Sequence, residues 1–280
     1  MLDLICLTLP YRREPFVRAL QGIKEAGYQS IGLGLPHADG GYPTEPTVDE
    51  AKRIKQIVDD YGLRVGTIYG AKTETDSAEE LCRWIDFAQY LDCPILLWVG
   101  IWGYRRFPDE PRPAEEFQQQ HRFFVEKMRR VSEYAAEREI TITLKPHTGN
   151  TATGPILRQT LDEIGSPACK AGLDPGNVRY YEGISPEEDV EPVLSDTALL
   201  VMKDHRGPRA HADFPVPGEG DVDFVHILKR LRSVDFSGPL VVERVDSADG
   251  QNLTAGELDR RIARARDNIL AMMRAAGFQP

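Results

Sequence analysis

Polar side chains that could carry out chemistry directly follow four apolar segments in the second half of the chain. The segments are ITITLK, KAGLD, ALLVMK and PLVVER, and the residues at or just beyond their ends are Lys145, His147, Asp174, Asn177, Lys203, His205 and Glu243. Amines, imidazoles and carboxylates move protons, stabilise developing charge and bind metals. A fold that gathers these segment ends could therefore build an active site from them.

The elements that must position these residues are short apolar segments alternating with amphipathic ones. Apolar residues at i, i+3, i+4 and i+7 predict helices, for example over residues 15–27 and 48–62. The candidate strands are residues 2–7, 30–35, 64–69, 95–100, 140–145, 170–174, 198–203 and 239–244.

Alternating strands and helices, with the strands apolar almost throughout, predict an α/β fold with a parallel sheet covered by helices. Eight such units favour closure into a single (β/α)8 TIM barrel, which we expect to span residues 1–280 as one domain. The lack of a GxGxxG motif before the first helix disfavours a dinucleotide-binding sheet.

In a barrel of this kind the active groups stand where the strands end. Each residue also has an ordinary structural interpretation: Asp174 could begin a turn before Pro175, and Lys203 could form a weak surface pair with Asp204. It is improbable that four neighbouring apolar strands would all end in polar groups by chance. We therefore predict a functional site at this mouth.

Composition narrows the class of protein. Hydrophobic residues make up 41% and charged residues 28%, as in ordinary globular enzymes. The net charge of −10 argues against nucleic-acid binding, and no apolar run is long enough to span a membrane. Four cysteines without paired spacing predict free thiols in a cytoplasmic protein. A homo-oligomer remains possible.

The motifs LDPGNV, KDHRG, GEGDVDF and VVER, in this order, resemble those of the xylose isomerase-like TIM barrels. That group includes sugar isomerases, keto-sugar 3-epimerases, inosose dehydratases and the AP endonucleases of family 2. The resemblance implies a divalent metal held by Glu, Asp, His and Glu on the last four strands. Asp174 and Glu243 match two of these positions, whereas Lys145 and Val201 replace the first Glu and the His. The chain is thus identified as a divergent member with altered metal ligands.

Lys145 is the most informative replacement. A charged amine cannot bind a metal, and two carboxylates alone are a poor site for Mn²⁺, Mg²⁺ or Zn²⁺. We therefore predict no metal, with the Lys145 ammonium near the metal's place and paired with Asp174 and Glu243. Two adjacent carboxylates should outweigh burial and keep the lysine charged, which favours an electrostatic role over Schiff-base chemistry.

The resemblance implies proton abstraction next to a carbonyl of a keto-sugar or polyol. Lys145 would stabilise the oxyanion, Glu243 would act as the base, Asp174 would hold the lysine, and His147 would move a second proton or hold a hydroxyl. The predicted substrate-binding residues are Asn177, Lys203, His205, Trp98, Trp102 and Arg105.

Other interpretations remain open at this stage. The chain could be a carbohydrate-binding barrel without catalysis, or a sugar dehydratase or lyase with a rearranged metal site. Such a site would place Mn²⁺, Mg²⁺ or Zn²⁺ on Asp174 and Glu243, with His147 and His205 as further ligands. An abasic-site endonuclease is disfavoured because the acidic chain lacks a basic face. Nothing in the sequence names the sugar.

Overall fold

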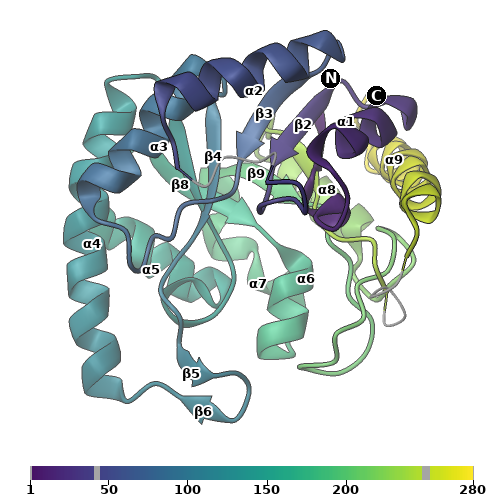
Figure 1. Ribbon diagram of the computed structural model, residues 1–280. Helices are drawn as coiled ribbons and strands as arrows, with labels where there is room; N and C mark the ends of the chain where they lie inside the picture. Colours follow the sequence, from purple (N-terminus) through teal and green to yellow (C-terminus); the bar gives the residue numbers. More distant parts are fainter. Residues whose placement is uncertain (1, 41–44, 248–252, 280) are drawn as a thin grey trace.

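A closed barrel of parallel strands forms the centre of the protein (Figure 1). The computed structural model describes residues 2–40, 45–247 and 253–279, and in this part of the chain eight strands form the barrel in the order β1-β10-β9-β8-β7-β4-β3-β2. Their bounds are β1 Leu4–Leu7, β2 Ser30–Leu33, β3 Arg64–Ile68, β4 Ile95–Val99, β7 Thr141–Lys145, β8 Cys169–Leu173, β9 Thr197–Val201 and β10 Leu240–Val242. The predicted (β/α)8 barrel is confirmed, and each strand lies within two residues of its predicted ends. The predicted extent of the domain, 1–280, stays a prediction.

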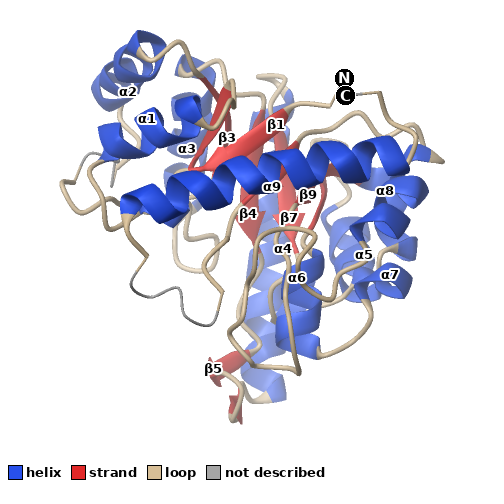
Figure 2. Ribbon diagram, turned by 90° about the vertical axis from the view of Figure 1, so that its right-hand side faces the viewer, coloured by secondary structure: helices blue, strands red, loops and turns tan. Residues whose placement is uncertain are grey.

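Helices surround the barrel. Their bounds are α1 Phe16–Glu25, α2 Val48–Asp60, α3 Ala78–Tyr90, α4 Ala114–Ala136, α5 Gly154–Ile164, α6 Pro175–Asn177, α7 Pro186–Asp189, α8 Phe224–Arg232 and α9 Ala255–Ala275. Short turns η1 Leu9–Tyr11, η2 Gly149–Thr151, η3 Val178–Glu182 and η4 Glu191–Asp196 complete them. Figure 2 shows α9 lying across one face of the barrel between α1 and α8. None of the helices described here has both the length and the apolar character that crossing a bilayer demands.

Side-chain caps fix where several helices begin. Ser77 and Glu80 form a reciprocal capping box at the start of α3, and Thr254 and Glu257 form another at the start of α9. Each box satisfies backbone N–H groups that the first helical turn leaves without a partner. These local signals are readable in the sequence, and they explain why the predicted helices form.

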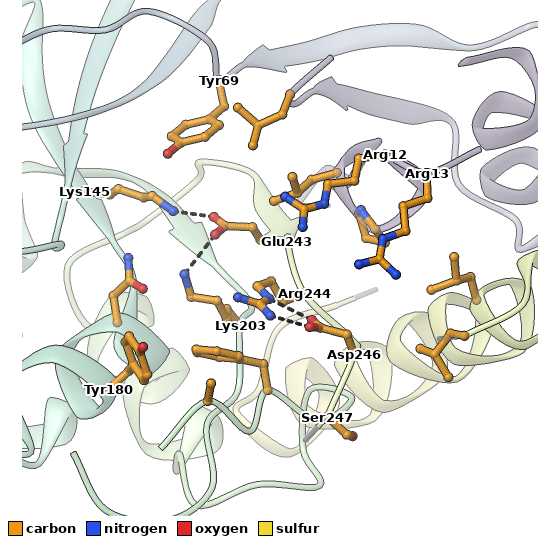
Figure 3. A pocket seen from close by; sticks show the side chains of 18 of the residues that line it. Arg12, Arg13, Tyr69, Lys145, Tyr180, Lys203, Glu243, Arg244, Asp246 and Ser247 are labelled. Carbon is orange, nitrogen blue, oxygen red and sulfur yellow. Dashed lines mark hydrogen bonds and ion pairs between the residues drawn. The ribbon is translucent and has the colours of Figure 1, made fainter. Parts of the chain in front are cut away.

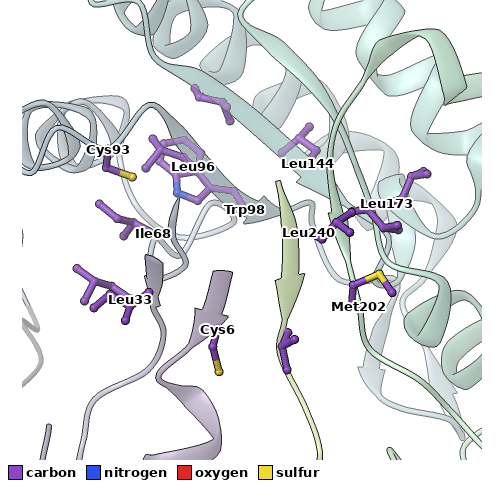
Figure 4. Close-up of a cluster of buried hydrophobic side chains, with 14 of the residues drawn as sticks. Cys6, Leu33, Ile68, Cys93, Leu96, Trp98, Leu144, Leu173, Met202 and Leu240 are labelled. Atoms are coloured by element: carbon purple, nitrogen blue, oxygen red, sulfur yellow. The ribbon is translucent and has the colours of Figure 1, made fainter. Parts of the chain in front are cut away.

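The strands bury two different faces. Ile5, Leu7, Leu97, Val201 and Val241 belong to the cluster that fills the barrel interior, since alternate residues of a strand point to opposite sides. The intervening residues pack outward under the helices. Figure 4 shows members of this outer cluster, among them Cys6, Leu33, Ile68, Leu96, Trp98 and Leu144.

A small hairpin outside the barrel is a regular element that the sequence did not indicate. Strands β5 (Tyr104–Arg106) and β6 (Glu110–Pro111) pair antiparallel between β4 and α4. Figures 1 and 2 show the hairpin projecting beyond the carboxyl ends of the barrel strands, away from the chain termini. It is too short to carry a periodic signal.

Gly238 offers a test of the barrel's packing. A Cβ built there would lie 2.0 Å from the carbonyl oxygen of Ala198, a backbone atom that cannot move aside cheaply. We expect Gly238→Ala to lower the free energy of unfolding by about 1–3 kcal/mol, measured by urea denaturation. In Gly256→Ala, in the first turn of α9, the nearest atom would lie at 3.9 Å. This control should be neutral or stabilising by up to about 1 kcal/mol. Equal losses in both variants would contradict the packing argument.

Candidate active site

The four charged residues at the barrel mouth continue the inward-facing rows of the strands. Lys203 lies two residues beyond Val201 and Glu243 two beyond Val241, and both valines belong to the interior cluster. Lys145 is the last residue of β7, and Asp174 directly follows β8. Because β7, β8, β9 and β10 are neighbours in the barrel, their ends bring the four side chains together above its apolar filling.

Two lysines share the same two carboxylates. The Lys145 Nζ and the Lys203 Nζ each lie 2.9 Å from Asp174 Oδ2. Lys145 also donates to Glu243 Oε2, and Lys203 donates to Glu243 Oε1 at 2.9 Å (Figure 3). The predicted pairing of Lys145 with both carboxylates is confirmed. The second ammonium was missed: Lys203 pairs with these carboxylates and not with Asp204 on the rim.

This network is almost completely enclosed. Lys145 and Asp174 are each 1% exposed, Lys203 is 3% exposed and Glu243 is 6% exposed. Charges so far from water persist only when each is paired, because desolvation otherwise costs several kcal/mol per ion. Two ammonium groups facing two carboxylates meet this condition, whereas Lys145 alone would have left one negative charge uncompensated.

Asp174 has a second role with its other oxygen. Its Oδ1 accepts a hydrogen bond of 3.0 Å from the backbone N–H of Asn177, so the residue caps α6 while it binds the lysines. The Asn177 side chain in turn donates to the Pro146 carbonyl at 2.7 Å. A Cβ at Gly176 would lie 2.3 Å from the Lys203 carbonyl oxygen, which explains the glycine in LDPGNV.

The two lysines differ in their proton affinity. Burial alone lowers the pKa of Lys145, but the charges of Asp174 and Glu243 outweigh it and hold that pKa above the ordinary value. Burial lowers the pKa of Lys203, and the charge of Lys145 adds to this, so the same carboxylates do not fully restore it. Burial would raise the pKa of Glu243, yet the two ammonium groups outweigh it and bring that pKa far below the usual range.

His147 lies beside the network as a neutral ring. Burial, with the charges of Lys145 and Lys203, lowers its pKa to about 3. Its Nε2 lies 3.0 Å from the hydroxyl oxygen of Tyr181. At neutral pH the imidazole therefore carries no charge and offers one donor and one acceptor.

A cavity of about 410 Å³ opens above the network. Lys145, His147, Asn177, Lys203 and Glu243 line it, so most of the predicted site residues meet there. Asp174 lies beneath this surface in contact with both lysines. The sequence had not indicated the rest of the wall, which includes Arg12, Arg13, Tyr69, Tyr180, Phe214 and Arg244 (Figure 3).

Four predicted binding residues do not reach this cavity. Trp98 is 0% exposed and faces the helices, because it lies one position out of step with the inward-facing Leu97. The Nε2 of the buried His205 lies 2.7 Å from the His211 carbonyl oxygen. Trp102 packs edge-on against His147 without lining the cavity. Arg105 is exposed on the hairpin, where it pairs with Glu116.

Asp204 explains why two sequence motifs occur together. Its carboxylate accepts backbone N–H groups from Gly218, Gly220 and Val222 at 2.8–3.2 Å, so KDHRG holds the loop GEGDV in place. The loop packs so closely that a Cβ at Gly220 would lie 2.3 Å from Asp204 Oδ1. Asp204 is thus a structural partner of the site and does not line the cavity.

The donor set does not suit a divalent metal. Lys145 and Lys203 already occupy the Asp174 and Glu243 oxygens that would bind a cation, and a charged amine repels a cation. His205, a proposed ligand of a rearranged site, turns to a carbonyl elsewhere. Within residues 2–40, 45–247 and 253–279, no three His, Cys, Asp or Glu side chains are grouped as metal ligands.

Comparisons with known proteins agree with this architecture. A family model described as the xylose isomerase-like TIM barrel matches residues 20–274. An L-ribulose 3-epimerase from Methylomonas sp. (strain DH-1) is 25% identical over 249 residues, which cover 82% of this chain and 78% of that protein. An inosose dehydratase from Geobacillus kaustophilus (strain HTA426) is 22% identical over 249 residues, or 81% and 79% of the two chains.

A solved structure supports the same fold. The crystal structure of a xylose isomerase-like TIM barrel protein from Mycobacterium smegmatis, in complex with magnesium, has a TM-score of 0.75 at 15% identity. The match covers 99% of this chain and 98% of that one. At this identity the likeness concerns the fold alone, so that protein's magnesium says nothing of the donor set here.

Charge balance in the network predicts a specific pattern of stability. Lys145→Met leaves two buried carboxylates with one ammonium, so we expect a loss of about 3–5 kcal/mol in the free energy of unfolding. Adding Glu243→Gln leaves Lys203 and Asp174 as a pair with no net charge. The double variant should therefore recover part of the lost free energy of unfolding. Urea denaturation measures both. Lys229→Met, on the exposed face of α8, is the control and should cost under about 0.5 kcal/mol. A double variant less stable than the single one would contradict the interpretation.

His147 predicts how stability changes with pH. Its pKa is about 3 in the folded protein against an ordinary value of 6.5, so between these values the unfolded chain binds more protons. Stability should therefore fall as the pH falls through this window, by up to about 1.4 kcal/mol per pH unit from this residue. Between pH 7 and 4.5, wild type should lose roughly 2–3 kcal/mol more than His147→Gln in urea denaturation. Parallel curves for the two proteins would rule out a buried neutral His147.

Proposed function

Because the chain belongs to the xylose isomerase-like TIM barrel family, we propose that it is an enzyme that isomerises or epimerises a keto-sugar or a related polyol derivative. The epimerase and dehydratase among its relatives support this class of substrate. The observation that carries the proposal is the pair of buried ammonium groups at the floor of the cavity. Positive charge fixed beside a substrate carbonyl is what proton abstraction from the adjacent carbon requires.

Lys145 is proposed to stabilise the oxyanion. An ammonium has three N–H donors, and Lys145 uses two of them on Asp174 and Glu243. Its third is available to an oxygen in the cavity. The face of the Tyr69 ring lies 5.1 Å from Nζ and adds to the stabilisation of the positive charge. A donor held this firmly needs no reorganisation when the oxyanion forms.

Proton transfer is proposed to involve Lys203. Glu243 is the base that the family pattern suggests, but a carboxylate whose pKa two ammonium groups depress is a weak base. Lys203 lines the same cavity, and its pKa is lowered while that of Lys145 is raised. Neighbouring groups with opposite shifts are the usual division between a proton carrier and a fixed charge. Glu243 would then orient both amines.

His147 and Asn177 are proposed to hold substrate hydroxyls. Both line the cavity next to the lysines, and neutral His147 can accept or donate one hydrogen bond. The chemistry proposed here proceeds without a divalent cation, because ammonium groups occupy the carboxylate oxygens that would bind one.

A dehydratase is the second candidate, favoured by the similarity to the inosose dehydratase. The same proton abstraction would be followed by loss of a hydroxyl from the next carbon. The mass of the product separates the two reactions, since epimerisation conserves mass and dehydration removes one water. A barrel that only binds carbohydrate would show neither product.

The test is exchange of a substrate proton with solvent. Wild type should incorporate deuterium from D₂O next to the carbonyl of a ketose, detected by mass spectrometry across a panel of ketopentoses and ketohexoses, with and without EDTA. Lys145→Met and Lys203→Met should each lower the rate by at least ~100-fold, and Lys229→Met should not. Exchange that EDTA abolishes, or that survives both active-site substitutions, would refute the proposed mechanism.

A further inference from the structure

Tyr181 lines the cavity, and the proposed reaction gives it no role. It belongs to η3, the helical turn that begins directly after α6. Its hydroxyl oxygen lies 3.0 Å from the Nε2 of His147, which stands two residues beyond the end of β7. This contact therefore joins two walls of the cavity, one supplied by η3 and one by the end of β7.

The surroundings of Tyr181 fix both its backbone and its ring. The Arg209 Nε donates a hydrogen bond of 2.6 Å to the Tyr181 carbonyl oxygen. The ring of Phe107, in the turn of the β5-β6 hairpin, lies 5.0 Å from the Tyr181 ring at an angle of 73°. The ring of Tyr180 lies 4.7 Å away on its own side. The Tyr181 hydroxyl thus has a defined position at His147.

The ring of His147 packs between two other rings. The centre of the Trp102 ring lies 4.4 Å from the centre of the imidazole, at an angle of 79°. The centre of the Tyr181 ring lies 4.3 Å from it, at an angle of 40°. A half turn of the imidazole would exchange its two nitrogens, but it would require these neighbours to move aside. The packing therefore keeps Nε2, and not Nδ1, at the Tyr181 hydroxyl.

Acidity decides which of the two groups donates. Burial raises the pKa of Tyr181, so the phenol keeps its proton. Burial, with the charges of Lys145 and Lys203, lowers the pKa of His147 to about 3, so at neutral pH the ring has a proton on one nitrogen and a lone pair on the other. A phenolic O–H is a stronger acid than the N–H of neutral imidazole, and the bare imidazole nitrogen is a stronger base than the phenol oxygen. The hydroxyl therefore donates to Nε2, which leaves the ring proton on Nδ1.

This tautomer limits what His147 can do in the cavity. With Nε2 occupied by Tyr181, Nδ1 is the ring nitrogen left for a ligand, and a protonated Nδ1 can only donate. Lys145 lines the same cavity and has its third N–H available to an oxygen. A neutral imidazole beside an ammonium gives a developing oxyanion a second fixed donor, without a second charge that would repel the first.

We propose that Tyr181 is a positioning residue that holds His147 in the Nδ1–H tautomer, so that His147 donates a hydrogen bond to an oxygen of the substrate. This deepens the proposed function, on which it rests for the identity of the ligand, by assigning His147 the part of donor and not of acceptor or base. The tautomer itself is a property of the protein alone.

The ¹⁵N NMR shifts of the His147 ring test the tautomer without a substrate. In protein labelled with ¹⁵N at histidine, the shift of each ring nitrogen distinguishes N–H from bare nitrogen, and the signals missing from His147→Phe identify residue 147. At neutral pH, wild type should show Nδ1–H and bare Nε2. Tyr181→Phe should move the ring towards the Nε2–H form, which prevails for histidine in water.

Tyr90→Phe is the matched control, since Tyr90 is 48% exposed at the end of α3, and it should keep the wild-type shifts. Wild type with the proton on Nε2, or Tyr181→Phe with unchanged shifts, would overturn the proposal. The wild-type measurement stands even if a variant fails to fold.

A double-mutant cycle separates a positioning role of Tyr181 from an independent one. In the deuterium exchange assay, Tyr181→Phe should lower kcat/KM by about 3–10-fold in the wild-type background. In the His147→Phe background it should cost under about 2-fold, because the hydroxyl then has no imidazole to orient. Equal losses in both backgrounds would refute the inference and leave the proposed function standing. Wild type that exchanges no proton in any ketose would refute the proposed function, and the NMR shifts alone would then decide the tautomer.

Discussion

The buried pairing of two lysines with two carboxylates is the constraint on which the site depends. Each of the four charges is at most 6% exposed, so none can rely on water, and each needs the other three to stay where they are. Four adjacent strands of a closed barrel meet that demand, because their ends are fixed relative to one another by backbone hydrogen bonds. The same rigidity gives the amines defined positions at the floor of the cavity.

The two-residue period of the strands explains which of the predicted site residues lie together. Lys145, Asp174 and Glu243 all stand at strand ends and all face inward. The prediction of a barrel was therefore sufficient to predict that these side chains meet. Lys203 was predicted to bind substrate, with a weak surface pair to its sequence neighbour Asp204 as the structural alternative. In the barrel these two residues diverge: Lys203 faces the mouth, and Asp204 binds the backbone of the 218–222 loop. Trp98 faces the helices and not the cavity. The sequence could not reveal this, since strands buried on both faces show no alternation that distinguishes inward-facing residues.

The cavity wall that Arg12 and Arg13 form could not be predicted from the sequence, because it depends on contacts between distant parts of the chain. Arg12 and Arg13 reach the cavity because Tyr11 is tied to Asp259 at the far end of the sequence. No local sequence pattern predicts a contact between residues so far apart in the chain. The hairpin that carries Arg105 away from the mouth is equally invisible, because two strands of three and two residues leave no periodic signature.

Two tethered ammonium groups differ physically from the divalent cation that the family pattern implies. A dication polarises a carbonyl more strongly and can bind several oxygens at once. An ammonium carries one charge and directs single N–H donors, so its effect depends on exclusion of water and on exact aim. The site supplies both, through near-complete burial and through carboxylates that fix two donors of each amine. It also makes the amines unequal, because Lys145 gains proton affinity from its surroundings while Lys203 loses it. An amine can release and regain a proton, whereas a metal ion has no proton of its own to release. In the proposed mechanism, one cluster therefore combines a fixed charge, Lys145, with a proton carrier, Lys203.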